Sequence, residues 1–394
     1  MNYTPESELR KRLDKFQKAL RKKGIDGAII IQRADLFYFS GTGQAAHLVV
    51  PSSNDPFLLA KKNFHRAQME SNLPIIEPMP TMKSFPSKVQ SILGKVHKIG
   101  MELDVIPTNL YFKYKKMFPQ SEIVDVSSLI LKIRMKKSEF ELKIIKQAGK
   151  MNDEMFSKIP DFLEVGISEV EFAGRLEAFY RKKGHQGGIR MRRFNQELYY
   201  GHVMSGSNVA IPSFFDGPTG GSGVSPSYPQ GAGFKKIVKN EPIWIDYAGV
   251  LGGYIVDQTR IFAFNSLPDK LIKAYDTVLA IVRFLKENCK PGVLCTDIYD
   301  GSYEIAKKEG LENYFMGYKS DVKWVGHGVG IELDELPVLA KNFKMPLEKS
   351  MVFAFEPKFV FPDIGGAGIE NTYYVTDSGV EPLTTFSNDV QLIY

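Results

Sequence analysis

Two aspartates inside a predicted β-hairpin constrain most strongly what this chain can fold into. The segment IWIDYAGVLGGYIVDQTRIF consists of two apolar, strand-like runs on either side of a Leu-Gly-Gly turn. If the turn is centred between Leu251 and Gly252, Asp246 and Asp257 face each other directly across the two strands. Directly opposed like charges destabilise a hairpin, and strand interiors disfavour Asp. We therefore expect a cation between the two carboxylates.

Three more potential ligands lie further along the chain. Glu356 in MVFAFEPKFVF and Glu370 in GAGIENTYYV are single carboxylates in apolar, strand-like runs, and His327 lies in a glycine-rich turn. Taken singly, such acids are more often ion-paired or at a strand edge than ligands. Together, four carboxylates and one imidazole suit divalent Mn, Co, Fe or Zn. Their number suits a site for two metal ions that activates water near neutral pH.

The sequence predicts two domains. Residues 1–130 alternate helical and β-rich runs, which is typical of a small α/β domain, and residues 131–394 form the second domain. The boundary is expected between Val126 and Lys137. In the second domain a pair of helices precedes the acidic hairpin, and a second pair precedes the run with Glu356. This order indicates a duplicated ααβ unit.

Capping boxes mark the starts of the first pair of helices. Ser138 with Glu141 opens one helix, and Ser168 with Glu171 opens the next. A basic amphipathic helix is also predicted near the start of the chain, in LRKRLDKFQKALRKKG, where it ends at Gly24.

Composition argues against several classes of protein. The net charge of +6 is modest and no nucleic-acid motif accompanies the basic helix, so we expect no nucleic-acid partner. No apolar run approaches the ~18 residues that span a bilayer, and the start lacks the pattern of a secretory signal. Cys289 and Cys295 are expected to be reduced thiols. These features predict a cytoplasmic protein without a membrane partner.

The segment 216–233, DGPTGGSGVSPSYPQGAG, is predicted to be a loop because Gly, Pro and Ser dominate it. It lacks the Lys-Ser/Thr pair of a phosphate-binding loop. A mobile surface loop and a wall of a binding pocket are both compatible with this composition.

The order and contexts of the five potential ligands resemble the metallopeptidase family of methionine aminopeptidase, Xaa-Pro aminopeptidase and prolidase. The segments IDYAGVLGGYIVDQTR, GHGVGIELDELP and AFEPKF are similar to segments of that family. IDGAIIIQRADLFYFSG resembles the creatinase-like N-terminal domain of its Xaa-Pro-cleaving branch. The resemblance covers nearly the whole chain and implies an α/β creatinase-like domain, an α+β pita-bread catalytic domain and a homodimer.

The resemblance also implies a role for each ligand. Asp246 would bind one of two divalent ions, and Asp257 and Glu370 would bridge the pair. His327 and Glu356 would complete the second ion. Glu356 would also be catalytic, as the group that relays a proton.

Several groups that hold the substrate in that family are absent from this chain. Asp334 stands where the segment after His327 normally ends in a second histidine. The region of another family histidine is the Gly/Pro/Ser loop, which offers Tyr228 instead. Gly368 stands where an arginine is common. Because such donors stabilise the reacting carbonyl oxygen, their loss indicates a different substrate.

Replacements for these groups lie nearby in the sequence. His202, in LYYGHVMSGSN, could supply a catalytic or substrate-binding imidazole, or it could be a buried structural histidine. The cluster of Arg190, Arg192 and Arg193 could supply a group that binds a carboxylate, with Arg193 as the candidate, or it could be a solvated face. Arg260 is expected to orient a ligating carboxylate. Asp334 and Tyr228 complete the predicted substrate-binding set.

The sequence therefore predicts a hydrolase with two divalent metal ions that cleaves an amide bond in a dipeptide or a related small substrate. An alternative within the same fold is a non-peptidase that cleaves a C–N or C–S bond of a small molecule. A binding module without activity is a third hypothesis, which the five intact ligands disfavour.

Overall fold

The computed structural model describes residues 3–319 and 321–394, and the chain divides into two compact units. The first unit contains Met1–Arg134 together with Arg192–Phe194. The second contains Met135–Met191 and Asn195–Tyr394. Within the described ranges, no helix is long and apolar enough to cross a membrane.

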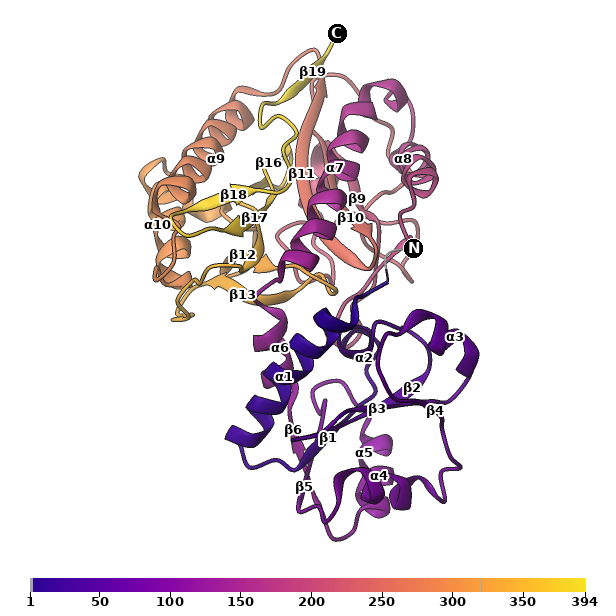
Figure 1. Cartoon of the computed structure of the whole chain (residues 1–394). Helices are drawn as coiled ribbons and strands as arrows, with labels where there is room; N and C mark the ends of the chain where they lie inside the picture. Colours follow the sequence, from indigo (N-terminus) through magenta and orange to yellow (C-terminus); the bar gives the residue numbers. More distant parts are fainter. Residues whose placement is uncertain (1–2, 320) are drawn as a thin grey trace. The chain divides into compact units, whose positions relative to one another are not determined.

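The first unit is an α/β domain built on a mixed sheet (Figure 1). Among the described residues the sheet has six strands, in the order β4 (Ile76–Pro78), β3 (Phe57–Ala60), β2 (Ala46–Pro51), β1 (Gly27–Ile30), β5 (Lys98–Met101) and β6 (Glu122–Asp125). The helices of this unit are α1 (Glu6–Lys22), α2 (Arg33–Ser40), α3 (Phe64–Glu70), α4 (Phe85–Leu93), α5 (Thr108–Met117) and α6 (Ser127–Arg134). The predicted helix near the start of the chain is thus confirmed as α1, and Gly24 follows it with a positive φ.

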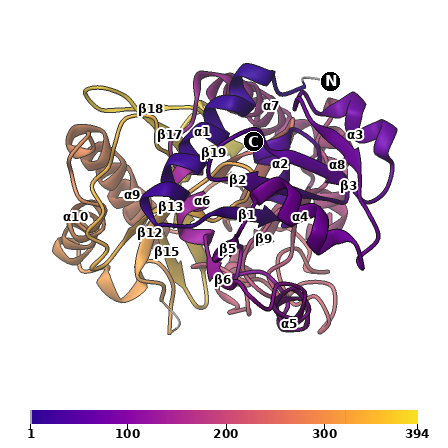
Figure 2. The same ribbon diagram turned by 60° about the horizontal axis from the view of Figure 1, so that its bottom comes forward.

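The second unit repeats a pair of helices followed by antiparallel strands. The helices α7 (Glu139–Phe162) and α8 (Glu169–Lys183) contact a sheet whose strand order is β19 (Gln391–Ile393), β11 (Tyr254–Phe264), β10 (Ile243–Leu251) and β9 (Gly201–Ser205). Helix α10 (Cys295–Lys308), which packs on α9 (Asp269–Asn288), contacts a sheet of order β13 (Glu335–Ala340), β12 (Trp324–Gly328), β14 (Val352–Phe355), β17 (Asn371–Val375) and β18 (Val380–Pro382). Figure 2 shows α9 and α10 side by side.

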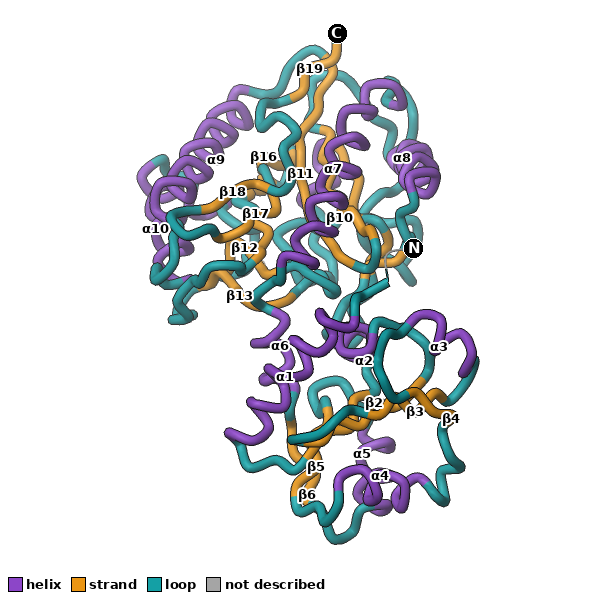
Figure 3. The backbone as a smooth tube through the Cα atoms, in the orientation of Figure 1, coloured by secondary structure: helices purple, strands orange, loops and turns teal. Residues whose placement is uncertain are grey.

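The second unit also contains shorter elements. They are β7 (Gly188–Ile189), β8 (Leu198–Tyr199), the 3-10 turns Gly206–Ala210 and Glu312–Tyr314, and the two-stranded pair β15 (Lys358–Phe361) and β16 (Gly365–Gly368). Figure 3 shows how loops link the strands of the second unit. The predicted duplicated order of helices and strands is therefore present.

The predicted helix starts are also confirmed. The Ser138 side chain accepts from the backbone N–H of Glu141, and the Glu141 carboxylate accepts from the backbone N–H of Ser138, at 2.9 Å. At the start of α8, Ser168 accepts from the backbone N–H of Glu171, whereas the Glu171 carboxylate accepts from Arg175 Nη2 at 3.0 Å, so the second predicted box is formed only by its serine half. These contacts satisfy backbone donors that the first turn of a helix leaves unpaired.

The acidic hairpin forms, but its register differs from the prediction. Leu251 pairs with Tyr254 across a two-residue turn of Gly252 and Gly253, both of which have positive φ. A turn with positive φ at both central residues matches the twist of the strands. As a result Asp257 lies opposite Ala248, two positions away from Asp246, and the expectation of directly opposed aspartates was wrong. A shift of two positions preserves the face, because strand side chains alternate with a period of two.

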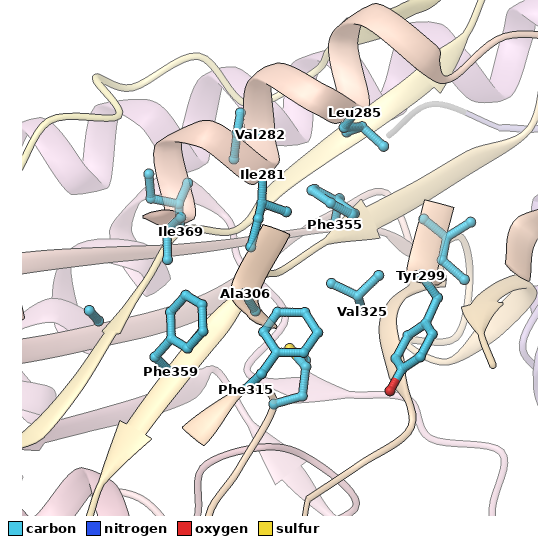
Figure 4. Packing of buried hydrophobic residues seen from close by; sticks show 14 of the residues in the cluster. Ile281, Val282, Leu285, Tyr299, Ala306, Phe315, Val325, Phe355, Phe359 and Ile369 are labelled. Atoms are coloured by element: carbon cyan, nitrogen blue, oxygen red, sulfur yellow. The ribbon is translucent and has the colours of Figure 1, made fainter. Parts of the chain in front are cut away.

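An apolar core fixes α9 and α10 on the sheet that carries β12 and β14. Ile281 and Leu285 of α9 are fully buried beside Phe355 of β14, and Val325 of β12 lies in the same cluster (Figure 4). Protein interiors of this kind are close-packed, so strand positions are held tightly. The strand ends that carry His327 and Glu356 are therefore rigidly supported.

Candidate metal centre

The five predicted ligands lie on strands of the second unit, or directly beside them, and these strands meet at one place. Two come from the hairpin, Asp246 on β10 and Asp257 on β11. His327 lies on β12, which pairs with β14, and Glu356 directly follows β14. Glu370 directly precedes β17 and forms an isolated backbone bridge with Thr259 of β11. This bridge joins the two sheets of the unit and brings the two groups of ligands together.

The histidine is held so that one ring nitrogen faces the acids. His327 Nδ1 lies 3.1 Å from the Leu333 carbonyl oxygen, 3.2 Å from the Gly328 carbonyl oxygen and 3.5 Å from Asp334 Oδ1. Because all three neighbours are acceptors, Nδ1 carries the proton in the neutral ring. The lone pair is then on Nε2, which lies 3.2 Å from Glu356 Oε1. The ring can satisfy this contact either by carrying a second proton on Nε2, which then donates to Glu356, or by binding a cation through that nitrogen.

Three of the ligands are close enough to bind one ion. Ligand atoms of Asp257, His327 and Glu370 lie within 4.8 Å of one another, and all three residues are buried. The Glu370 Oε1 atom is buried without a hydrogen-bond partner, although its other oxygen, Oε2, accepts from Thr259 Oγ1 at 2.8 Å. Buried polar atoms without partners are costly. The donor set therefore fits a divalent ion bound by these three side chains.

The electrostatics of this group are those of crowded buried acids. Burial, with the neighbouring Glu370 and Asp246 carboxylates, raises the pKa of Asp257 well above its usual value. Burial and the Glu356 carboxylate raise the pKa of Glu370 to about 7, although Lys358 opposes this. Burial lowers the pKa of His327, but the hydrogen bond to Glu356 and the surrounding carboxylates raise it well above its usual value. Burial and the crowding of carboxylates both contribute to these shifts, and a bound cation would neutralise the crowded negative charge.

A lysine also reaches into the cluster of acids, and the sequence analysis did not consider it. Lys358 Nζ on β15 lies 2.9 Å from Asp246 Oδ2, 2.6 Å from Glu356 Oε2 and 3.0 Å from Glu370 Oε2. Its side chain is 2% exposed. Burial lowers the pKa of Lys358, yet Asp246, Glu356 and Glu370 raise it well above its usual value. The signal in the sequence was a lysine within an apolar strand two positions after a predicted ligand.

A narrow cleft opens onto these residues, and the 216–233 loop supplies part of its wall. Asp216, Gly217, Pro218 and Thr219 line the cleft together with Phe215. The backbone N–H of Gly231 donates to the Gly220 carbonyl oxygen at 2.7 Å, so the loop folds back on itself. The first four residues of the loop therefore form part of a pocket wall, which was one of the two interpretations of its sequence.

Two of the predicted substrate-binding residues lie in the cleft. His202 is on β9 opposite Asp246, is buried, and stacks edge-on against Phe215 with ring centroids 5.3 Å apart. Its Nε2 has no hydrogen-bond partner, and burial lowers the pKa of the ring to about 4, so the imidazole is neutral. Asp334 lines the same cleft beside His327.

The other two predicted substrate-binding residues do not line this cleft. Arg193 is exposed and is grouped with the first unit, as is Arg192. Arg192 is ion-paired there with Asp35 at 2.9 Å and Asp104 at 2.7 Å, which gives it a structural contact. Tyr228 is half-buried, and its ring lies 6.2 Å from that of Tyr199.

Arg260 supports the centre in a different way from the one expected. It does not bond to a ligand carboxylate in the described residues. Instead its buried guanidinium donates to the backbone carbonyl oxygens of Thr259 and Glu370, both at 2.8 Å, and to Asn371 Oδ1 at 2.7 Å. The arginine therefore fixes the main chain at the junction of the two sheets rather than a carboxylate.

Comparison with known proteins agrees with this geometry. Residues 143–377 match the model of metallopeptidase family M24, and residues 12–136 match that of the creatinase/prolidase N-terminal domain. The chain belongs to metallopeptidase family M24. It is a hydrolase of this metal-dependent family, with an α/β creatinase-type domain before a pita-bread catalytic domain, as the sequence predicted.

Several similar proteins match along nearly their full length. The uncharacterized peptidase YqhT of Bacillus subtilis is 26% identical over 95% of this chain and 97% of its own. The Xaa-Pro dipeptidase of Pyrococcus furiosus is 25% identical over 95% of this chain and 98% of its own. The solved structure of the Xaa-Pro dipeptidase from Bacillus anthracis has a TM-score of 0.84 and 25% identity over 98% and 100% of the two chains.

Proposed function

We propose that this M24 hydrolase cleaves the amide bond of an Xaa-Pro dipeptide or a closely related small substrate. The observation that carries the proposal is the convergence of Asp257, His327 and Glu370 at the base of a cleft that also contains a neutral imidazole. Asp257, His327 and Glu370 would hold a divalent ion, which would supply Lewis-acid chemistry for polarising the carbonyl and activating water. Mn is one candidate, because carboxylates with one imidazole suit it.

Residues of the chain itself would handle the proton and the substrate. Glu356, which contacts His327 and Lys358, would accept a proton from water and deliver it to the leaving amine. His202 would contact the carbonyl oxygen of the substrate, because its Nε2 is buried without a partner. Asp334 would attract the protonated amine of the substrate.

A second candidate function follows from how the cleft would treat the carboxylate of a dipeptide substrate. Of the described residues that line the cleft, none is an arginine, and Lys358 already donates to three carboxylates. A free dipeptide carries a carboxylate that would find no cationic partner among these residues. An amide of a small, positively charged molecule without that carboxylate is therefore the alternative substrate.

A product assay separates the two candidates. Metal-loaded protein is incubated with Xaa-Pro dipeptides, the same dipeptides with an amidated C-terminus, Xaa-Pro tripeptides and small cationic amides, and the products are identified by mass spectrometry. Cleavage of free dipeptides supports the first candidate, and cleavage only of amidated or cationic compounds supports the second. His327→Ala serves as the control because it removes one ligand. Cleavage that persists in this variant would contradict the proposed site.

The remaining expectations are part of the same proposal. We infer a homodimer that acts in the cytoplasm on a short peptide or small molecule, without a nucleic-acid or membrane partner. The two free and buried cysteines, Cys289 and Cys295, are compatible with a reducing compartment. Light scattering of the purified protein measures the oligomeric state.

A further inference from the structure

We propose that the ammonium group of Lys358 takes the place of one of the two metal ions predicted from the sequence, so that the centre holds a single divalent ion bound by Asp257, His327 and Glu370. The proposal deepens the proposed function and rests on it only for the presence of an ion. It concerns how many ions bind, which is independent of the substrate.

The first support is the set of contacts around the ammonium group. Asp246, Glu356 and Glu370 each direct one oxygen at Lys358 Nζ, at 2.9, 2.6 and 3.0 Å. An ammonium group has three N–H donors, so each donor has its own carboxylate acceptor. These distances are those of charge-assisted hydrogen bonds. The lysine is therefore a fully satisfied buried cation.

The second support is that the two carboxylate oxygens of Glu356, and likewise those of Glu370, face different neighbours. Glu356 directs Oε2 at Lys358 and Oε1 at His327 Nε2, 3.2 Å away. Glu370 likewise directs Oε2 at Lys358, while its Oε1 lies 3.9 Å from His327 Nε2 and has no hydrogen-bond partner. One side of each carboxylate is thus occupied by the lysine. The other oxygen of each carboxylate lies toward His327, on the side of the proposed ion site.

The third support is that the surrounding backbone leaves room for this side chain. Lys358 pairs with Gly368 across β15 and β16. A Cβ atom at Gly368 would lie 2.8 Å from Lys358 Cγ and 2.7 Å from the ring of Trp244. Any larger residue at position 368 would therefore displace either the lysine or the tryptophan. The glycine that replaces the expected arginine makes the placement of Lys358 possible.

A second ion would have to displace the ammonium group from these oxygens. The metal ion and the ammonium group would compete for the same oxygen atoms of Asp246, Glu356 and Glu370. Two positive charges beside the same carboxylates would also repel each other. The Lys358 side chain is 2% exposed, and it packs over the Trp244 ring with Nζ 5.6 Å from the centroid. Moving the ammonium group away would leave a buried charge without its partners. The second position is therefore closed to a metal ion.

The number of bound ions tests the proposal directly. The full-length protein is stripped of metal with a chelator and titrated with Mn²⁺ in a calorimeter, and the metal content after gel filtration is measured by mass spectrometry of the elements. We expect one equivalent per chain for the wild type. For Lys358→Ala we expect two equivalents, because the three carboxylates are released and space is opened. Lys349→Ala, which removes an exposed lysine paired with Asp377, is the charge-matched control and should bind one.

Each outcome decides between the possibilities. Two equivalents or none in the wild type would overturn the proposal, as would a single equivalent in a folded Lys358→Ala variant. If that variant does not fold, as judged by circular dichroism, anomalous diffraction from Mn²⁺-soaked wild-type crystals replaces it. One anomalous peak beside His327 is expected there, and a second peak beside Asp246 would contradict the proposal. Two ions with peptide cleavage would leave the proposed function intact, whereas one ion without cleavage of any substrate would leave only the proposal on Lys358.

Discussion

At the scale of single residues, His202 has an imidazole nitrogen that no other described residue hydrogen-bonds. Its Nε2 is buried and has no hydrogen-bond partner, and the ring faces the cleft beside Asp246. Gly231 packs against the ring so closely that a Cβ atom there would lie 2.8 Å from His202 Cδ2. The loop therefore fixes the orientation of the imidazole. This nitrogen is therefore available for a hydrogen bond with a ligand or a water molecule.

Replacing His202 should lower activity without removing the metal ion. His202→Phe keeps the ring that stacks on Phe215 but removes both nitrogen atoms. We expect kcat/KM to fall by ~10²–10³-fold on whichever substrate is cleaved, because one donor to the reacting oxygen is lost. His202→Gln, which retains a donor, should recover part of this loss. Metal content and kinetics are measured on the same samples, and equal activity of all three proteins would identify a purely structural histidine.

At the scale of elements, the long helix α7, near the start of the second unit, packs against the acidic hairpin of β10 and β11. Its buried face includes Ile144, Ile145 and Asn152, and it contacts both β10 and β11. The Asn152 side chain donates to Gln258 Oε1 at 2.9 Å, next to the proposed ligand Asp257. The helix therefore helps to hold the strand that carries this ligand. Its N-terminus is fixed by the capping box of Ser138 and Glu141.

Removing the cap of α7 should destabilise the second unit. Ser138→Ala leaves backbone donors of the first turn without a partner, at a cost of ~1 kcal/mol in the free energy of unfolding. Ser157→Ala, an exposed position within the same helix, should change that free energy by less than ~0.5 kcal/mol. Both tryptophans, Trp244 and Trp324, lie in the second unit, so urea unfolding followed by their fluorescence reports this unit. Equal losses in the two variants would contradict a specific role for the cap.

At the scale of the whole molecule, the chain has two units with separate cores, so their stabilities respond to different conditions. In the first unit, His47 on β2 is buried against Phe85 and shares a 2.6 Å hydrogen bond with the Tyr114 hydroxyl. Burial, with the charges of Lys61 and Lys113, lowers the pKa of His47 from 6.5 to about 4. The unfolded chain therefore binds a proton at a higher pH than the folded chain does.

This difference predicts that the first unit loses stability as the pH falls. The contribution of His47 is fully present above pH 6.5 and declines toward pH 4, with a loss of ~2 kcal/mol between pH 7 and pH 5. His47→Gln has no group that titrates in this range, so its free energy of unfolding should change less over the same interval. Amide hydrogen exchange of β1 and β2, corrected for intrinsic rates, measures both proteins. Parallel pH dependence in the two would show that His47 does not cause the loss.

Much of the metal centre could be predicted from the sequence by itself. Asp246, Asp257, His327, Glu356 and Glu370 stand out because polar ligands within apolar strands need a cation, and the structure brings all five together. The capped helices and the two-part organisation follow from local signals as well: a capping box depends on residues three positions apart, and helical periodicity spans only a few turns. Sequence determines such features because the atoms involved are close along the chain.

Only the tertiary structure showed that the ammonium group of Lys358 lies among these side chains. The register of the hairpin depended on which two residues formed the turn, and Leu-Gly-Gly allowed either Leu251 with Gly252 or Gly252 with Gly253. Lys358 reaches Asp246 from a strand 112 positions away, and its room depends on Gly368 and Trp244. Arg193 and Tyr228 were near the site only in sequence and do not line the cleft. Contacts between distant segments are set by how sheets pack, and no local pattern encodes that packing.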